Sequence, residues 1–251
     1  MKVIFVGAGP GDPELLTVKA ERLLRSARCC IYAGSLVAET IVDLLPADAA
    51  RYDSASLSLD QIVDIVKAAR ERDVDVVRLH SGDPSIYGAI GEQMARLEEL
   101  GIDYEVVPGV SSFQAAAAAL KIELTVPEIS QTIVLTRTSG RTPLPEHQEL
   151  ERIARTRATL CIFLSIHKIE EIARVLTGEY GADAPAAVVS HASRPDQIVI
   201  RGTLADIARQ TRASGITKTA LVIVGNAVAR ADRVSRLYDK GFTHGYREAE
   251  R

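Results

Sequence analysis

The sequence has few aromatic side chains and no Trp: Phe and Tyr together make up 4% of its 251 residues. Proteins that bind single-stranded nucleic acid stack the bases on aromatic rings, so this composition disfavours that class of function. Basic residues are not in excess either, and the formal net charge is -3 at pH 7. There is no overall basic field for nucleic acid or an anionic membrane. An anionic ligand would have to be held by a local group of Arg and Lys.

Cysteine is also scarce, with Cys29, Cys30 and Cys161 alone and no C-x-x-C pair or zinc spacing among them. We expect these thiols to be small core residues. The five His side chains show no helical metal spacing, so we predict no protein-bound metal. No apolar run approaches the roughly 18 residues of a membrane span, and no signal peptide precedes the first apolar run. These features predict a soluble, cytoplasmic protein that binds neither membrane nor nucleic acid.

Short apolar runs alternate with amphipathic segments in the first half of the chain. The runs predict strands at 3–6, 29–33, 75–79 and 104–108. The periodicity predicts helices at 13–27, 36–45, 59–72, 88–100 and 111–120. This alternation is typical of an α/β domain with a largely parallel sheet. We place that domain at residues 1–120, followed by a linker at 121–130.

The second half has a different rhythm of strands and helices. Apolar runs predict strands at 131–136, 159–164, 185–191, 197–202 and 219–225, with helices at 146–155, 168–178 and 203–214. Gly178 is expected to end the middle helix, as glycine commonly does. The short turn before residue 197 predicts an antiparallel pair with the strand that precedes it. This pattern predicts a second α/β domain at 131–240, and the polar residues 241–251 are predicted to form a tail.

The stretch VGAGPGDPELLT at 6–17 invites a dinucleotide interpretation, because a glycine-rich loop follows a buried strand. The dinucleotide pattern is G-x-G-x-x-G, and here Asp12 occupies the third glycine position. Pro10 and Pro13 also remove two N–H donors that a pyrophosphate would need. A nicotinamide oxidoreductase is therefore disfavoured, and the loop is expected to approach its ligand without cradling phosphate.

Four small-residue stretches each follow a predicted strand: GAGPGDP at 7–13, HSGDPSIYG at 80–88, PGVSS at 108–112 and FLSIH at 163–167. Ligands of open α/β sheets bind outside the carboxyl ends of the strands, so together these stretches predict a small-molecule site. The alternative is that Gly, Asp and Pro simply form turns there. Gly82 is expected to let a ligand lie against the backbone. A Gly82→Val change should then block binding while leaving the fold intact.

GAGPGDPELLT, GDPSIYG and PGVSS resemble the tetrapyrrole methylase family, over nearly the whole chain. Its members are S-adenosylmethionine-dependent methyltransferases that act on corrin and porphyrin precursors. The resemblance implies two α/β domains with the cofactor in the cleft between them, unlike the Rossmann-like methyltransferases, and a homodimer. It also implies cofactor contacts at Pro10, Ser81, Gly82, Asp83, Ile86, Ser111, Ser112, Ser165, Ala192, Thr219 and Ala220.

Within the family, YAGSLV at 32–37 and TRTSGRTPLPE at 136–146 are similar to members that methylate C11 of precorrin-4, or of its cobalt form, in cobalamin biosynthesis. Another tetrapyrrole such as uroporphyrinogen III remains the alternative substrate. A protein-modifying member of the diphthine synthase type is disfavoured by YAGSLV. A homologue that binds S-adenosylmethionine without catalysis belongs to a different class and also remains open.

Such a substrate carries many carboxylates, which guanidinium groups bind in a two-pronged manner. Arg137 and Arg141 are the leading candidates for binding the macrocycle, and His80 also lies where it could contact it. Arg78, Lys168 and Arg194 are further candidates. Methyl transfer to an electron-rich ring carbon depends chiefly on alignment, so no catalytic base is assigned.

Overall fold

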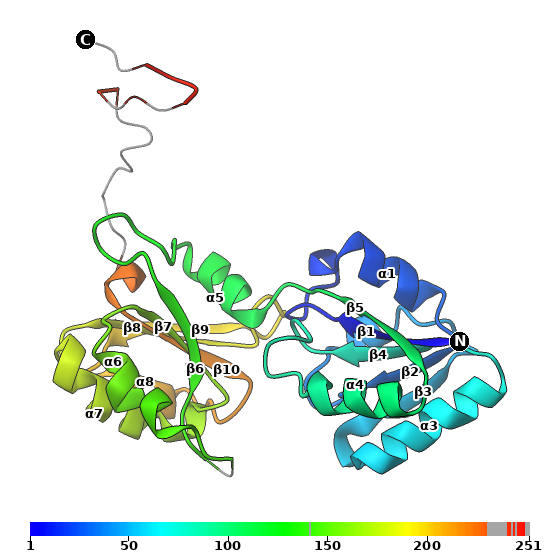
Figure 1. Ribbon diagram of the computed structural model, residues 1–251. Coiled ribbons are helices and arrows are strands. Elements are labelled where there is room, and N and C mark those ends of the chain that lie inside the picture. Colours follow the sequence, from blue (N-terminus) through cyan, green and yellow to red (C-terminus); the bar gives the residue numbers. More distant parts are fainter. Residues whose placement is uncertain (141, 230–239, 242, 244, 249–251) are drawn as a thin grey trace. The chain divides into compact units, whose positions relative to one another are not determined.

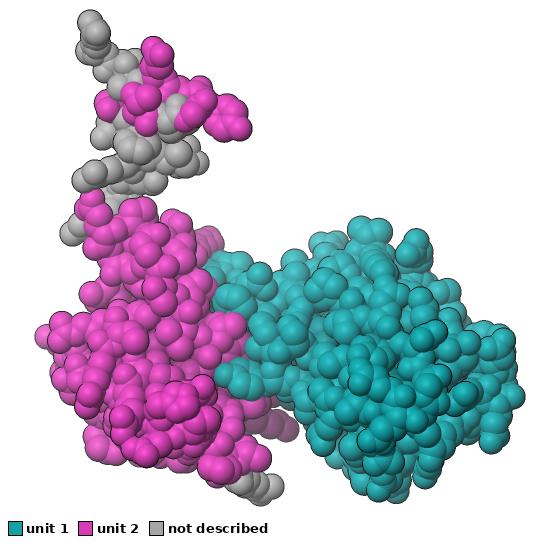
Figure 2. Space-filling view, viewed as in Figure 1, with its two compact units in different colours: residues 1–119, 191–197 teal, residues 120–190, 198–251 magenta. Residues whose placement is uncertain are grey.

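The computed structural model describes residues 1–140, 142–229, 240–241, 243 and 245–248. Arg141, residues 230–239 of the predicted second domain and part of the predicted tail therefore lie outside the described residues. The chain divides into two compact α/β units, coloured separately in Figure 2. Unit 1 comprises residues 1–119 and 191–197, and unit 2 comprises residues 120–190 and 198–251. This division differs from the predicted one in the segment 191–197, which interrupts the second half of the sequence.

Unit 1 is built on a five-stranded sheet with the order β3-β2-β4-β1-β5, and all its strand pairs are parallel. The strands are β1 (Lys2–Gly7), β2 (Cys29–Tyr32), β3 (Ala50–Asp53), β4 (Val76–His80) and β5 (Asp103–Val107). The predicted parallel sheet and four of these strands are confirmed. The sequence did not predict β3, because this short edge strand contains no buried residue and so has no apolar run.

Helices cover both faces of the unit 1 sheet, as is usual for parallel sheets (Figure 1). Successive strand residues point to opposite faces. Ile4 and Val6 therefore pack with α1 (Val18–Arg25) and α2 (Glu39–Val42). Val3 and Phe5 pack with α3 (Leu59–Glu71) and α4 (Ile90–Glu99) on the other face. Cys29 and Cys30 are buried, which confirms their core placement.

The helices of unit 1 are shorter than the sequence pattern predicts. The region 13–27 is a 3-10 turn at Pro13–Leu15 followed by α1, whose N-terminus is capped by Thr17 Oγ1 accepting from Ala20 N at 3.1 Å. Only α2 forms within 36–45. The helix predicted from residue 88 begins at Ile90, because Ala89 has a left-handed φ of 49°. The last helix of this half, α5 (Ser112–Leu120), agrees with its predicted range.

Unit 2 contains a mixed five-stranded sheet with the order β6-β7-β10-β8-β9. Its strands are β6 (Ile133–Arg137), β7 (Thr159–Phe163), β8 (Pro185–Ser190), β9 (Ile198–Thr203) and β10 (Ala220–Val224). β6 and β7 are parallel, and the other neighbouring strands are antiparallel. The predicted antiparallel pair of β8 and β9 is confirmed.

Three helices pack around one core in unit 2: α6 (Leu150–Ala154), α7 (Ile169–Tyr180) and α8 (Ile207–Ala213). The predicted end of α7 at Gly178 is wrong. The helix continues to Tyr180, and Gly181, with φ of 86°, follows its last residue. A single glycine inside a helix costs only about 1 kcal/mol relative to Ala, so tertiary packing can carry the helix through it.

Among the helices that the structure describes, none is long and apolar enough to cross a membrane. The same residues hold no group of three or more His, Cys, Asp and Glu side chains placed to bind a metal ion.

Candidate functional site

The loops after β4, β1 and β5 lie side by side, because these three parallel strands are neighbours and their carboxyl ends share one edge of the sheet. Ala8 N donates to the carbonyl of His80 at 2.7 Å. Gly9 and Gly82 exchange two backbone hydrogen bonds of 3.2 and 2.8 Å. The stretches 7–13, 80–88 and 108–112 therefore come together as a single surface of unit 1.

Three glycines let these loops approach closely. A Cβ atom added to Gly7 would lie 2.6 Å from Gly109 Cα and 2.7 Å from Gly82 O. One added to Gly109 would lie 2.2 Å from Gly82 O. These distances are far shorter than van der Waals contact, so no side chain fits. Sequence reasoning missed the roles of Gly7 and Gly109; the signal was the presence of glycine at or just after the ends of adjacent strands.

The carboxylate of Asp83 ties two of the loops together. Its Oδ2 accepts from Gly109 N at 2.9 Å, and its Oδ1 accepts from the backbone N–H of Ser85 at 2.8 Å and from the Ser85 hydroxyl. Burial alone would raise the pKa of Asp83. The Ser85 hydroxyl and the N–H groups of Gly109 and Ser85 outweigh that effect and hold the pKa below its usual value. Asp83 is therefore a fixed negative charge at this surface.

Gly82 has a left-handed backbone with φ of 65°. A Cβ atom there would lie 3.6 Å from Ser111 Cα, an ordinary contact distance. The restriction on a side chain at Gly82 is thus conformational, since this region favours glycine. Valine at position 82 would therefore strain the loop itself as well as approach the ligand, and the effect of Gly82→Val on the fold stays a prediction.

His80 and Arg78 lie on one face of β4 and are both buried. His80 is 6% exposed, its ring centroid lies 5.9 Å from that of Phe5, and its Nε2 has no hydrogen-bond partner among the described residues. Burial, followed by the charge of Arg78, lowers the pKa of His80 to about 3. The imidazole is therefore neutral at physiological pH and offers an unused nitrogen.

Arg78 is held inside unit 1 by its own partners. Its guanidinium donates to Gln93 Oε1 at 3.0 Å and to the Ile31 carbonyl at 3.3 Å. Burial lowers the pKa of Arg78 to about 10, so the side chain remains a cation near neutral pH. With 7% of its surface exposed, Arg78 joins β4 to β2 and α4, and its binding to a macrocycle stays a prediction.

The other predicted cofactor residues of unit 1 vary in exposure. Pro10, Ser111 and Ala192 are buried, whereas Ser81, Ile86 and Ser112 are partly exposed. The backbone carbonyl of Ser111 accepts from Gln114 N at the start of α5, at 3.1 Å. Ala192 lies in the turn 191–197, which packs within unit 1.

In unit 2, the ends of the parallel strands β6 and β7 are joined by hydroxyl groups. Ser165 is 1% exposed and its Oγ accepts from Thr138 N at 2.8 Å and from Thr138 Oγ1 at 3.0 Å. The same hydroxyl donates to the Phe163 carbonyl at 2.7 Å. One donor and two acceptor positions are the whole capacity of a hydroxyl. A cofactor contact at Ser165 would therefore use its backbone atoms.

Arg137 stabilises the loop that follows β6. Its guanidinium donates to the carbonyls of Thr138, Thr142 and Pro143, at 3.3, 2.9 and 3.3 Å. Lys168, a further candidate, forms an ion pair of 3.1 Å with Glu171. These two candidate cations thus have protein partners, and their binding to a substrate stays a prediction.

Thr219 and Ala220 lie at the same edge of the unit 2 sheet as Ser165. β10 runs antiparallel to β7 with Val222 opposite Ile162, so the start of β10 lies beside the end of β7. Ala220 also pairs with Ser190 at the end of β8. Thr219 has φ of 52°, which is rare for a β-branched residue.

Left-handed backbone conformations gather near the predicted cofactor residues. Some of those outside glycine, such as Asp73 and Lys121, follow helices and are ordinary helix ends. Others are at or beside predicted cofactor residues: Tyr87, Leu164, His191, Ser193 and Thr219. Leu164 is also 60% exposed, an unusual state for a large apolar side chain. Backbone strain of this kind concentrates at functional sites.

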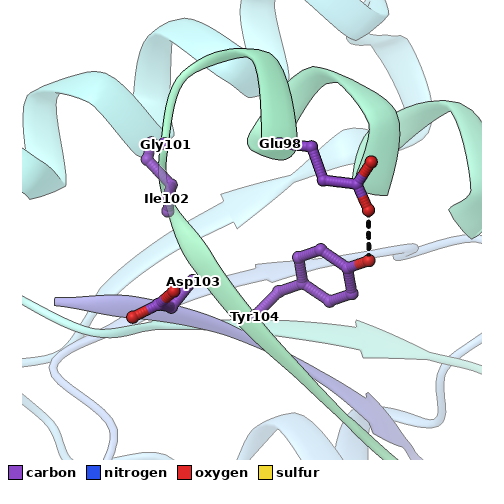
Figure 3. Close-up of a pocket in the computed structure, with 5 residues that line it drawn as sticks. All are labelled: Glu98, Gly101, Ile102, Asp103 and Tyr104. Carbon is purple, nitrogen blue, oxygen red and sulfur yellow. Dashed lines mark hydrogen bonds between the residues drawn. The ribbon is translucent and has the colours of Figure 1, made fainter.

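A separate hollow of about 380 Å³ lies in unit 1 at the beginning of β5 (Figure 3). It is lined by Glu98, Gly101, Ile102, Asp103 and Tyr104, and the Tyr104 hydroxyl donates to Glu98 Oε1 at 2.6 Å. Because the sheet is parallel, this is the end opposite the glycine-rich loops. It contains none of the predicted site residues.

The chemistry of the unit 1 loops suits a ligand with positive charge. The stretches 7–13, 80–88 and 108–112 contain Asp12 and Asp83 but no Lys or Arg. The N–H groups of Ala8, Gly9 and Asp12 donate to protein oxygens, and Pro10 has no N–H. These N–H groups of the loop 7–13 are therefore already used, whereas the carboxylates can bind a cation and the serine hydroxyls can bind sugar hydroxyls.

Comparison with known proteins agrees with this geometry. The family model of the Tetrapyrrole (Corrin/Porphyrin) Methylases matches residues 2–208. A Precorrin-4 C(11)-methyltransferase of Rhodococcus erythropolis is 53% identical over 230 residues, covering 91% of this chain and 92% of that protein.

Two solved structures are also similar. The X-ray structure of a cobalt precorrin-4 methyltransferase has a TM-score of 0.88 and 39% identity, covering 90% of this chain and 95% of that one. A uroporphyrin-III C-methyl transferase from Thermus thermophilus, complexed with S-adenyl homocysteine, has a TM-score of 0.76 and 30% identity, covering 91% and 99%. The chain belongs to the tetrapyrrole methylase family.

Proposed function

We propose that the protein transfers a methyl group from S-adenosylmethionine to C11 of precorrin-4, or of cobalt-precorrin-4, to give the precorrin-5 stage. The observation that carries this proposal is the 53% identity with a Precorrin-4 C(11)-methyltransferase over 91% of the chain. The likeness to a solved cobalt precorrin-4 methyltransferase supports the same substrate. We expect the enzyme to act in the cytoplasm as a homodimer.

S-Adenosylmethionine supplies an electrophilic methyl group on a sulfonium. The ring carbon would form a bond to that methyl as the carbon–sulfur bond breaks, with the electron pair remaining on sulfur in S-adenosylhomocysteine. The positive charge would pass to the ring, which would lose it by releasing a proton from a ring nitrogen to water. An electron-rich carbon of a reduced tetrapyrrole needs no strong base for this step. The contribution of the protein is alignment, which can supply about 7–11 kcal/mol.

The proposed cofactor contacts are those that the family resemblance implies, and they occur in both units. In unit 1 the binding residues are Pro10, Ser81, Gly82, Asp83, Ile86, Ser111, Ser112 and Ala192. In unit 2 they are Ser165, Thr219 and Ala220. Asp83 keeps its negative charge at neutral pH, because Ser85 and Gly109 donate to it. That fixed charge favours a cationic ligand over a phosphate.

The substrate would be recognised through its carboxylates. Arg137, Arg141 and His80 remain the proposed contacts. His80 would act as a neutral hydrogen-bonding group, because burial keeps its imidazole uncharged. The hydrogen bonds to the carbonyls of Thr138, Thr142 and Pro143 use three of the five N–H donors of Arg137, so the guanidinium would bind a carboxylate without giving them up.

A methyl-transfer assay with three substrates tests the proposal. The purified protein is incubated with S-adenosylmethionine and precorrin-4, cobalt-precorrin-4 or uroporphyrinogen III, and the methylated position is read by NMR. Methylation at C11 of either precorrin is the expected result. Turnover of uroporphyrinogen III alone would contradict the proposed substrate and ring position. Binding of S-adenosylhomocysteine without turnover of any of the three substrates would favour a non-catalytic homologue.

A further inference from the structure

A turn between β8 and β9 packs against two loops of unit 1. Residues 191–197 are part of unit 1 (Figure 2, teal). The backbone N–H of Asp12 donates to Ser193 Oγ at 3.1 Å. The side chain of Arg194 reaches Pro10 in the loop after β1 and Leu36 in the loop after β2. The turn therefore joins two segments that precede it by more than 150 residues.

The guanidinium of Arg194 donates hydrogen bonds to two backbone carbonyls in different loops. Its Nη2 donates to the Leu36 carbonyl, and its Nε lies 3.5 Å from the Pro10 carbonyl. A guanidinium is a rigid planar fork, so two carbonyls bound to it are held at a set separation. A lysine ammonium is a single flexible point charge and cannot reproduce that spacing. The guanidinium of Arg194 thus has hydrogen-bond partners within the protein, whereas the sequence suggested it as a candidate for binding carboxylates of the substrate.

Gly11 provides the space for this arrangement. A Cβ atom on Gly11 would lie 2.5 Å from Arg194 Cγ and 2.6 Å from Arg194 Nε. The stem of Arg194 therefore lies directly across the backbone of the loop that contains Pro10. Any side chain at position 11 would displace it.

The turn is internally braced, so it presents Arg194 in one position. Arg194 N donates to the His191 carbonyl at 2.9 Å, and Ser193 N donates to Gln197 Oε1 at 2.8 Å. His191 Nδ1 lies 2.7 Å from Asp196 Oδ2. A side chain held by such a turn loses little further freedom when it binds the two carbonyls.

We propose that Arg194 is a positioning residue for the cofactor. It holds the loop of Pro10 and the loop of Leu36 at the separation that binds S-adenosylmethionine, without itself contacting the ligand. This inference rests on the proposed function, since Pro10 is a proposed cofactor contact. If Arg194 bound only one of the two carbonyls, its guanidinium would no longer hold the two loops together. The loops would then have to be ordered when the cofactor binds, which lowers the affinity.

Arg194→Lys tests this role, with Arg51→Lys as a matched control. Arg51 Nη2 also donates to two loop carbonyls, those of Leu45 at 3.0 Å and Pro46 at 3.3 Å, but these lie outside the proposed site. Calorimetric titration of both full-length variants with S-adenosylhomocysteine gives the dissociation constants, and urea unfolding gives their stabilities. Arg194→Lys should weaken binding about tenfold, whereas Arg51→Lys should leave it within about twofold, at similar urea midpoints.

The kinetic readout separates positioning from general stability. For Arg194→Lys, KM for S-adenosylmethionine should rise by a larger factor than kcat falls. Equal S-adenosylhomocysteine affinity in the two folded variants would overturn the inference. Absence of binding to the unaltered protein would instead overturn the proposed function.

Hydrogen–deuterium exchange on the unaltered protein tests the same link without a substitution. Adding S-adenosylhomocysteine should slow exchange in residues 8–12, 34–37 and 192–197 together, because Arg194 connects them. Protection confined to residues 8–12 would contradict a positioning role for Arg194.

Discussion

The two units hold their candidate site loops by different means. In unit 1, the loops touch through the backbones of Gly7, Gly82 and Gly109, with no room for a side chain at Gly7 or Gly109. In unit 2, the loops are joined by the hydroxyls of Thr138 and Ser165. Backbone packing of this kind tolerates no added atom, whereas a hydroxyl contact can be weakened by degrees. Substitutions in the two units should therefore differ in severity.

Gly109→Ala is expected to have the largest effect. The added methyl would lie 2.2 Å from the Gly82 carbonyl oxygen and 2.9 Å from Gly7 Cα, and neither backbone can move without disturbing a strand end. Overpacking typically costs about 1–3 kcal/mol, and a clash between backbones should reach the top of that range or exceed it. Urea unfolding measures the loss of stability.

Gly178→Ala is the matched control for this change. Gly178 lies inside α7, and no atom lies within 4 Å of an added Cβ. Alanine there should stabilise the protein by about 0.5–1 kcal/mol. Equal losses from both substitutions would contradict the close-packing explanation.

Gly82→Ala should have an intermediate effect. Its methyl would meet Ser111 Cα at an acceptable 3.6 Å, so the cost comes from the left-handed backbone alone. That cost is about 1–2 kcal/mol for an L-residue. Asparagine tolerates this conformation better, so Gly82→Asn should lose less stability than Gly82→Ala in the same unfolding experiment. The reverse order would indicate that space, rather than φ, limits position 82.

Ser165→Ala should cost about 1 kcal/mol, because Thr138 N and its hydroxyl lose a hydrogen-bond partner at the end of β7. Ser165→Thr keeps the oxygen and should separate loss of the hydrogen bonds from a change of volume. Thermal unfolding of both variants provides the comparison. If Ser165→Ala lost as much stability as Gly109→Ala, the proposed difference in severity between substitutions in the two units would be contradicted.

The smallest effect on stability is expected from lowering the pH, through protonation of Asp83. The pKa of Asp83 is lower in the folded protein than in the unfolded chain, where it has its ordinary value. Its stabilising contribution is therefore complete above the unfolded pKa and is lost as pH falls through the folded one. Comparing Asp83→Asn with the unaltered protein by urea unfolding between about pH 6 and pH 3 should show the stability difference shrinking with acidity. A difference independent of pH would contradict the role of the charge.

The sequence predicted most of the sheet but less of the loop contacts. Apolar runs marked every described strand except β3, whose residues are not buried. The glycine-rich stretches marked the site edge, yet the pattern alone does not tell whether a glycine such as Gly109 faces a ligand or another backbone. The contact of Asp12 with Ser193 joins residues 181 positions apart, and local periodicity carries no information at that separation.

We propose that the glycine-rich loops of unit 1 contribute to an S-adenosylmethionine site. Calorimetric titration of the unaltered protein with S-adenosylhomocysteine tests it most directly. We expect one site per chain with a dissociation constant in the micromolar range. Absence of binding at ligand concentrations up to about 1 mM, where even weak sites fill, would contradict it.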